Sequence, residues 1–268
     1  MTERVSVTIS GGVADVRLNR PEKLNALDRA MFEALAETGA GLKSDPSVRA
    51  VVLSGEGRGF CAGLDFASFM AMAGDADPGA SLLDRRSADS PANFAQRAAW
   101  VWTELPVPVI AAVHGVAYGG GLQIALGADI RIAAPDAQLS VMEIKWGLIP
   151  DMSGTQTLRH LVRLDVAKEL TFTGRVVSGR EAAELGLVTR VAEDPRAAAL
   201  AMAHEIAGKS PDAIRAGKHL LDQAPLVSVA DGLRLEERLQ RGLIGSANQL
   251  EAVAANMQKR PPVFRDPA

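Results

Sequence analysis

Hydrophobic residues follow two different spacings in the first part of the chain. Residues 5–9 and 13–18 are rich in β-branched side chains and flank the pair Gly11-Gly12, a pattern that predicts a β-hairpin. Apolar residues then recur at helical spacing from position 27 to position 42, and the apolar segment 50–53 predicts a short strand. Further strands are expected at 107–113, 130–133 and 188–191, and further helices at 94–105, 121–128, 155–162 and 166–173.

Beyond residue 194 the pattern is helical throughout. Helices are expected at 195–208, 211–223, 228–244 and 247–258. Alternating strands and helices followed by helices alone indicate an α/β core, residues 1–194, with a helical C-terminal region, residues 195–268. Residues 74–92 have low hydrophobicity and many small or charged side chains, so we expect a mobile surface segment there, and a lid over a substrate is one role for it.

The composition is typical of a soluble globular protein: of 268 residues, 47% are hydrophobic and 23% charged, and the net charge is −3. A mildly acidic chain gives no reason to expect nucleic acid or an anionic membrane as a partner. The first residues, MTERVSVTIS, lack the apolar core of a signal peptide and the arginine-rich character of a transit peptide. The single cysteine, Cys61, cannot form an internal disulfide, which fits a reducing compartment. We therefore expect a cytoplasmic protein.

Two glycine-rich segments stand between a predicted strand and a predicted helix: GFCAGLD at 59–65 and AYGGGLQ at 117–123. Such glycines indicate either a backbone that approaches a ligand closely or ordinary turns that need positive φ. Known nucleotide motifs do not fit, because G-x-G-x-x-G fails at Phe60 and residues 174–181 lack the Lys and Ser/Thr of a P-loop. The four histidines do not have metal-ligand spacing, so no metal is expected.

Four segments together resemble the crotonase superfamily, the enoyl-CoA hydratases and isomerases. They are NRPEKLNALD (19–28), GRGFCAGLD (57–65), GVAYGGGLQIALGADIRIA (115–133) and EIKWGLIPDMSGTQTL (143–158), and they follow the family's order over nearly the whole chain. The resemblance implies an α/β fold, a spiral of repeated β-β-α turns, whose C-terminal helices build homotrimers or dimers of trimers. It also implies an acyl-CoA thioester as substrate and no separate cofactor, since coenzyme A is part of the substrate.

The same resemblance implies a site that is built largely from backbone atoms. The amides of Leu64 and Gly120 are expected to form an oxyanion hole, in which two fixed N–H groups stabilise negative charge on a thioester carbonyl oxygen. The residues expected to contact coenzyme A are Lys23, Leu24, Ala62, Gly63, Asp65 and, from a neighbouring subunit, Lys259. For Lys23 and Lys259, an ordinary solvated lysine is the alternative.

The expected acid–base groups depart from the family pattern. Hydratases of the family use two glutamates, and this chain has Gln123 at the first position and Glu143 at the second. An amide orients a water or a substrate group but does not exchange protons at neutral pH. Eight residues after Glu143, Asp151 stands where family hydratases carry glycine and where dienoyl-CoA isomerases, and an aryl-CoA dehalogenase, carry aspartate. Those isomerases usually have a further carboxylate at the position of Gln123, so the match is partial.

Three functions remain open from these residues. The first, which we favour, is an enoyl- or dienoyl-CoA double-bond isomerase in which Glu143 and Asp151 form an acid–base pair, since neighbouring carboxylates raise one pKa. The second is an enoyl-CoA hydratase in which Gln123 positions water and Glu143 transfers the proton. The third is a non-catalytic protein that binds CoA thioesters, which the retained loops and carboxylates disfavour. For Asp151, the alternative role is the N-cap of the helix near Thr155.

The aromatic residues and the cysteine each have two interpretations. Phe66, Trp100, Trp102 and Trp146 are candidates to line an acyl tunnel, although core packing is the commoner role for any one of them. With 4% aromatic residues, the chain offers little for an aryl-lined dehalogenase pocket. Cys61 is expected to be a small packing group, because nothing near it in sequence would lower the pKa of its thiol.

Overall fold

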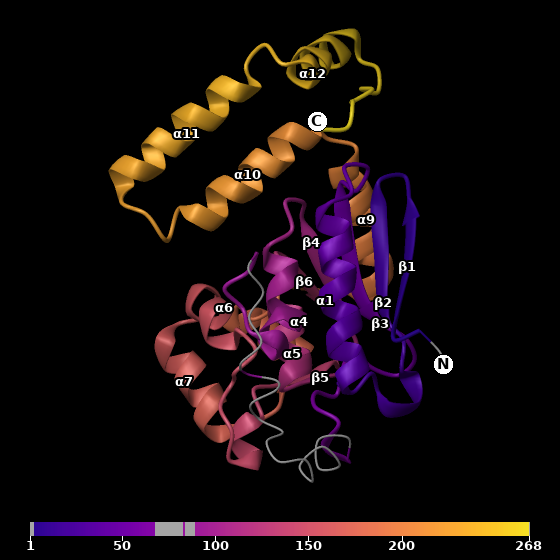
Figure 1. Ribbon diagram of the computed structural model, residues 1–268, viewed down its shortest axis with the longest axis vertical. Helices are drawn as coiled ribbons and strands as arrows, with labels where there is room; N and C mark the ends of the chain where they lie inside the picture. Colours follow the sequence, from indigo (N-terminus) through magenta and orange to yellow (C-terminus); the bar gives the residue numbers. More distant parts are fainter. Residues whose placement is uncertain (1–2, 68–82, 84–88, 268) are drawn as a thin grey trace.

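The structure is a computed structural model that describes residues 3–67, 83 and 89–267. A six-stranded sheet with the order β1-β2-β3-β4-β6-β9 forms the centre of the described chain (Figure 1). Its strands are β1 (Val5–Ser10), β2 (Val13–Leu18), β3 (Ala50–Gly55), β4 (Val109–Val113), β6 (Ile130–Ala133) and β9 (Arg190–Val191). β1 pairs with β2 antiparallel, which confirms the predicted hairpin, and the later neighbours in the sheet are parallel.

Helices cover both faces of this sheet. One face carries α1 (Arg29–Lys43), α4 (Phe94–Thr103) and α5 (Gly120–Leu126), and the other carries α9 (Pro195–Ala207). Successive side chains of β3 point to opposite faces, so Val51 and Leu53 join the core under α1 and α4, whereas Ala50 and Val52 pack toward α9. Every residue of β3 is buried, as expected for a parallel strand that is covered on both sides.

The close crossing of α1 and α4 explains a glycine in the middle of a helix. Asp28 caps the start of α1, where its side chain accepts a hydrogen bond from Met31 N. A Cβ at Gly39 would lie 2.4 Å from a methyl carbon of Val101 in α4. Gly39 therefore lowers the intrinsic stability of α1 but allows the two helices to approach closely.

The described chain also contains short elements that the sequence pattern did not predict. They are β5 (Val116–Tyr118), β7 (Gln138–Ser140), β8 (Val177–Ser178), α8 (Gly179–Leu185) and the 3-10 helices η1 (Pro21–Lys23) and η2 (Glu143–Trp146). β5, β7 and β8 form a second sheet in that order. Apart from α8, which has seven residues, these elements are runs of two to four residues, too short to show a period, so only their partners in space define them.

The remaining helices lie close to their predicted positions. They are α6 (Gly154–Leu161), α7 (Leu164–Thr173), α10 (Pro211–Gln223), α11 (Val229–Leu243) and α12 (Ala247–Gln258). Figure 1 shows α10, α11 and α12 standing away from the sheet, at the opposite end of the molecule from β5. Most of the segment 74–92, expected to be mobile, lies outside the described residues.

A buried lysine joins this helical region to the core. Lys218 of α10 is 9% exposed, and its Nζ donates to Val107 O (3.0 Å) and to Asp129 Oδ2 (2.8 Å). Asp129 also accepts a hydrogen bond from Val109 N at the start of β4. The ammonium is therefore paired as a buried charge requires, and it holds α10 against the end of the sheet. In the described part of the chain, no helix is both long and apolar enough to cross a membrane.

Candidate active site

The two glycine loops lie against each other, backbone to backbone. Cys61 and Ala117 form an isolated β-bridge, in which Cys61 N donates to Val116 O (2.9 Å) and Tyr118 N donates to Cys61 O (3.0 Å). A Cβ at Gly121 would lie 2.3 Å from Cys61 O, so a side chain at this position would push the loops apart. Segments 59–65 and 117–123, which are far apart in sequence, thus form one continuous surface.

The amide of Leu64 is directed away from the strand-like segment beside it. Leu27 N donates to Gly63 O (2.8 Å) and Asp65 N donates to Leu27 O (3.0 Å), so Leu64 pairs with Leu27 as in a parallel ladder. Because the groups on either side of Leu64 face Leu27, the N–H of Leu64 faces the other way. No acceptor among the described residues takes this hydrogen.

The amide of Gly120 is similarly available. Gly120 is the first residue of α5, where N–H groups have no acceptor within the helix, and no other described residue accepts from it. A Cβ at Gly63 would lie 3.7 Å from Gly120 N, and Leu64 and Gly120 line the same cavity. The structure therefore brings together the two residues predicted for the oxyanion hole, with both donors unoccupied.

The cavity beside these amides has a volume of about 310 Å³ and a mainly apolar wall. It is lined by Phe32, Ala62, Gly63, Leu64, Phe66, Leu83, Ala95, Tyr118, Gly119, Gly120, Met142, Glu143, Trp146, Leu148, Asp151 and Met152. The rings of Phe66 and Trp146 meet with their centroids 3.9 Å apart. Both line the cavity, whereas Trp102 is fully buried in the core and Trp100, which is half-buried, belongs to neither set.

Glu143 presents one free carboxylate oxygen within this cavity. It begins η2 and is 8% exposed. Its Oε1 accepts a hydrogen bond from Gln123 Nε2 (2.6 Å), while its buried Oε2 has no hydrogen-bond partner among the described residues. Burial raises the pKa of Glu143 above its ordinary value of 4.5, and the negative charge of Asp151 raises it further. A carboxylate with a raised pKa and a free oxygen is suited to exchange protons with a ligand.

Gln123 is enclosed behind Glu143 and uses both ends of its amide. It is 2% exposed, and its Oε1 accepts from Met152 N (2.8 Å) and from Gly154 N (2.8 Å). Two backbone donors identify the oxygen of the amide, so the Nε2 group necessarily faces Glu143. Gln123 thereby connects Glu143 to the start of α6.

Asp151 lines the cavity and does not cap α6. The N-cap residue of α6 is Ser153, whose own side chain makes no capping hydrogen bond, and Gln123 accepts the first free amide of the helix, that of Gly154. The N-cap role considered for Asp151 is therefore wrong, because the acceptor comes from a distant residue. Burial raises the pKa of Asp151 above its usual range.

The segment around Lys23 and Leu24 is joined to the first glycine loop. Ala62 N donates to Leu24 O (2.9 Å), which places these predicted coenzyme contacts beside Ala62. Asn25, which is fully buried with φ of 57°, donates from Nδ2 to Glu56 O (2.9 Å), Gly59 O (2.9 Å) and Phe60 O (3.2 Å). This role of Asn25 is not visible in the sequence pattern, although asparagine is enriched among residues with positive φ.

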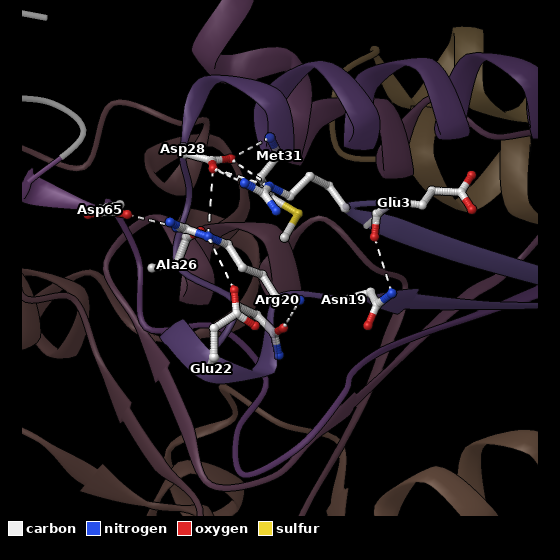
Figure 2. Close-up of polar contacts among 10 residues, drawn as sticks. Glu3, Asn19, Arg20, Glu22, Ala26, Asp28, Met31 and Asp65 are labelled. Carbon is white, nitrogen blue, oxygen red and sulfur yellow. Dashed lines mark hydrogen bonds and ion pairs between the residues drawn. The ribbon is translucent and has the colours of Figure 1, made fainter. Parts of the chain in front are cut away.

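Asp65, another predicted coenzyme contact, uses its carboxylate within the protein. Figure 2 shows it facing Arg20, whose Nη1 lies 2.8 Å from Asp65 Oδ2. The side chains are each 10% exposed. Contact between Asp65 and a ligand is not needed to explain its position.

The geometry above agrees with a comparison of the whole chain. The family model described as enoyl-CoA hydratase/isomerase matches residues 8–267. The chain belongs to this family. In Mus musculus, the protein named enoyl-CoA hydratase domain-containing protein 2, mitochondrial, is 37% identical over 263 residues, which cover 94% of this chain and 84% of that protein. Methylglutaconyl-CoA hydratase, mitochondrial, from the same species is 35% identical over 262 residues, covering 95% and 80%.

Solved structures of the enoyl-CoA hydratase/isomerase family have the same fold. An enoyl-CoA hydratase from Bacillus anthracis superposes with a TM-score of 0.88 at 32% identity, over 97% of this chain and 98% of that chain. An enoyl-CoA hydratase from Polaromonas sp. JS666 gives a TM-score of 0.87 at 29% identity, over 97% and 99%. The crotonase-like α/β fold expected from the sequence is confirmed.

Two further predictions for this family member can be placed in the structure. Lys259 is the exposed C-cap residue of α12, with φ of 51°. The helix α12 lies at the opposite end of the molecule from β5 (Figure 1). Cys61 is fully buried, and burial raises the pKa of its thiol to about 12, which agrees with a packing role. Among the described residues, no group of three His, Cys, Asp or Glu side chains could hold a metal ion.

Proposed function

We propose that this enzyme shifts a carbon–carbon double bond in an enoyl- or dienoyl-CoA thioester. The observation that carries the proposal is the environment of Gln123, which stands where family hydratases have a second glutamate. Both lone pairs of its carbonyl are occupied by Met152 N and Gly154 N, and its amide group faces Glu143. Of the two glutamate positions that family hydratases use, only Glu143 can therefore exchange protons, and Gln123 is enclosed behind it and does not line the cavity.

A double-bond shift needs only such a single base. Glu143 Oε2 would remove a proton from the carbon next to the thioester carbonyl, and the electron pair would move onto the carbonyl oxygen. The enolate would be stabilised by the amides of Leu64 and Gly120, two donors that are already in place. Return of the proton at the far end of the conjugated system completes the shift, with Asp151 as a second proton carrier in the same cavity. No water is added or lost.

Hydration makes a different demand on the site. A water molecule must be held and deprotonated while a proton is delivered to the neighbouring carbon, which family hydratases achieve with two carboxylates. To bind water through its carbonyl, Gln123 would have to release an amide at the start of α6. The relatives described above carry hydratase names, so hydration is the alternative that an experiment must distinguish.

Three substrates separate these functions. The purified protein is incubated with trans-2-enoyl-CoA, 3-enoyl-CoA and 3,5-dienoyl-CoA, and products are followed by ultraviolet absorbance and mass. We expect isomers of unchanged mass from the second or third substrate. A gain of one water on the first, with no isomer from the others, would show a hydratase instead. Binding of all three without turnover would support a CoA-thioester-binding protein.

The variant Gln123→Glu tests whether the glutamine at position 123 is the reason that we expect little hydration. Glutamate retains acceptors for Met152 N and Gly154 N and supplies the missing carboxylate, so we expect hydration of trans-2-enoyl-CoA to rise by about tenfold or more. Gln123→Met, of similar size without polar groups, is the control and should not gain hydratase activity. An equal rate of hydration in Gln123→Glu and the unchanged protein would contradict the role assigned to this position.

The raised pKa values predict a pH dependence. Glu143 acts as a base only when deprotonated, so kcat should rise with pH through an apparent pKa above the ordinary 4.5. In Asp151→Asn the negative neighbour is removed, which lowers the pKa of Glu143 and should move the acid limb of the profile to lower pH. The profile is measured with 3-enoyl-CoA from pH 4 to 8. A limb that stays in place would show that Asp151 does not act on the base.

We further propose that residues 195–268 form an oligomerisation region. Apolar side chains are exposed along its helices and connecting segments, namely Leu221, Leu226, Val227, Val229, Leu233, Ile244, Leu250, Val253, Met257 and Val263. Self-association would bury them. In this arrangement Lys259 would contact coenzyme A on a neighbouring subunit, since the helix it caps, α12, lies at the opposite end of the molecule from β5, the strand before the second glycine loop (Figure 1).

A further inference from the structure

We propose that the buried ion pair between Arg20 and Asp65 positions the Leu64 amide for the developing oxyanion. This inference rests on the oxyanion hole of the proposed function and assigns a positioning role to two residues outside it. Asp65 directly follows Leu64 in the chain, and its Oδ2 lies 2.8 Å from Arg20 Nη1.

The backbone around Leu64 depends on one short bridge. Leu27 holds the loop through two hydrogen bonds, to Gly63 O and from Asp65 N, and these determine which way the Leu64 N–H points. A bridge of a single residue pair has no neighbouring ladder to maintain its twist. Rotation of the peptide planes around Leu64 would change the direction of its N–H while breaking only these two bonds.

Arg20 spans both sides of this bridge. Its Nη1 donates to Ala26 O (3.0 Å), next to Leu27, and the same nitrogen pairs with Asp65 next to Leu64. The backbone of Arg20 is held in turn, because its N–H donates to Asn25 Oδ1 (2.8 Å). One guanidinium thus connects the two segments that flank the oxyanion donor.

Arg20 forms a second ion pair, with Asp28. Arg20 Nε lies 3.6 Å from Asp28 Oδ2 (Figure 2). Asp28 Oδ2 also lies 2.7 Å from Arg4 Nη2. Burial opposes the ionisation of Asp28, but the hydrogen bonds from Arg4 and Met31 N outweigh it, and the pKa of Asp28 lies below its usual range. The charges of the Arg20–Asp65 pair and of the partly buried Arg4–Asp28 pair beside it thus balance, as removal from water requires.

Asp65 and the Arg4–Asp28 pair are expected to have different roles. Asp28, which Arg4 binds, caps α1 and meets Arg20 at Nε, whereas Asp65 meets Arg20 at Nη1 and is part of the loop itself. Loss of Asp65 should therefore affect the donor, and loss of Arg4 should affect mainly stability. An oxyanion donor contributes chiefly to the transition state, so its displacement lowers kcat more than it raises KM.

Infrared spectroscopy can test the donor without turnover. Each variant is made in the Glu143→Gln background and bound to trans-2-butenoyl-CoA with ¹³C at the thioester carbonyl. Polarisation by the two amides should lower the C=O stretching frequency relative to free ligand. We expect Asp65→Asn to remove roughly half of that shift, since one of two donors is displaced. Arg4→Gln, the control, should keep the full shift while lowering the melting temperature.

Kinetics of the same variants in the otherwise unchanged protein complete the test. Asp65→Asn should lower kcat by about tenfold or more with KM within about twofold, and Arg20→Lys should do the same if Asp65→Asn does not fold. A full infrared shift in Asp65→Asn would overturn the positioning role of Asp65 but not the oxyanion hole. A rise in KM with kcat unchanged would also overturn that role, because it would indicate that Asp65 contacts coenzyme A. No shift in the Glu143→Gln background itself would overturn the oxyanion hole as well.

Discussion

Glu143→Gln is expected to lower kcat by roughly 10²-fold or more on whichever enoyl- or dienoyl-CoA the enzyme converts. The physical reason is that Glu143, whose Oε2 has no hydrogen-bond partner among the described residues, lines the same cavity as Leu64 and Gly120. Glutamine keeps the size of the side chain and an oxygen to accept from Gln123 Nε2, but it cannot carry a proton. Steady-state kinetics with the converted substrate measure the effect, and substrate binding should be retained.

Stability measurements provide the control for this variant. The pKa of Glu143 is raised in the folded protein, so the folded state holds this proton more tightly than the unfolded chain. The stabilisation is present below the unfolded pKa and is lost as pH rises through the folded value. At pH 8 the neutral glutamine should therefore melt at the same or a higher temperature. Unchanged activity in Glu143→Gln would displace this residue as the base.

Gly63→Ala should also lower kcat by about 10²-fold, through the oxyanion hole rather than the base. Gly63 has φ of 85°, and a Cβ there would lie 2.6 Å from Tyr118 O. Backbone atoms cannot move aside as a flexible side chain does, so the first loop must shift and carry the Leu64 amide with it. The measurement is kcat for the substrate of the unchanged protein.

Gly245→Ala is the matched control for this effect. Gly245 has φ of 79°, but a Cβ there would meet nothing within 4 Å, and it lies between α11 and α12. Alanine at positive φ lowers the free energy of unfolding by about 1 kcal/mol in either position, so both variants should have a lower melting temperature. Only Gly63→Ala should lose activity. Equal kcat in the two variants would argue against a precise role for the Leu64 amide.

The main layers of the fold follow from local patterns. The hairpin, β3 and the long helices are encoded by apolar residues at a spacing of two or between three and four, which is visible without knowledge of the partner. β7 and β8 were missed because three and two residues carry no such period. β7 pairs with β5 on one side and with β8 on the other, and this pairing, which defines both strands, exists only in the folded chain.

The candidate site likewise has features that the sequence shows and features that only the folded chain shows. Glycine motifs around Leu64 and Gly120 were recognised in the sequence because backbone donors require small neighbours at fixed positions. The contacts of Gln123 could not be recognised, since its partners Met152 and Gly154 are 29 and 31 residues away. For the same reason Asp151 was considered as a cap of α6, although the acceptor for the helix comes from α5.

By itself, the sequence determined the α/β architecture, the family, the two glycine loops and the presence of Glu143, Gln123 and Asp151. These features depend on residue types at short separations. Only the tertiary structure decided that Gln123 is occupied by the backbone of α6, that Glu143 keeps one oxygen free, and that Arg20 pairs with Asp65. A polar side chain has several hydrogen-bonding groups, and which of them remain available for chemistry depends on partners that folding brings from elsewhere in the chain.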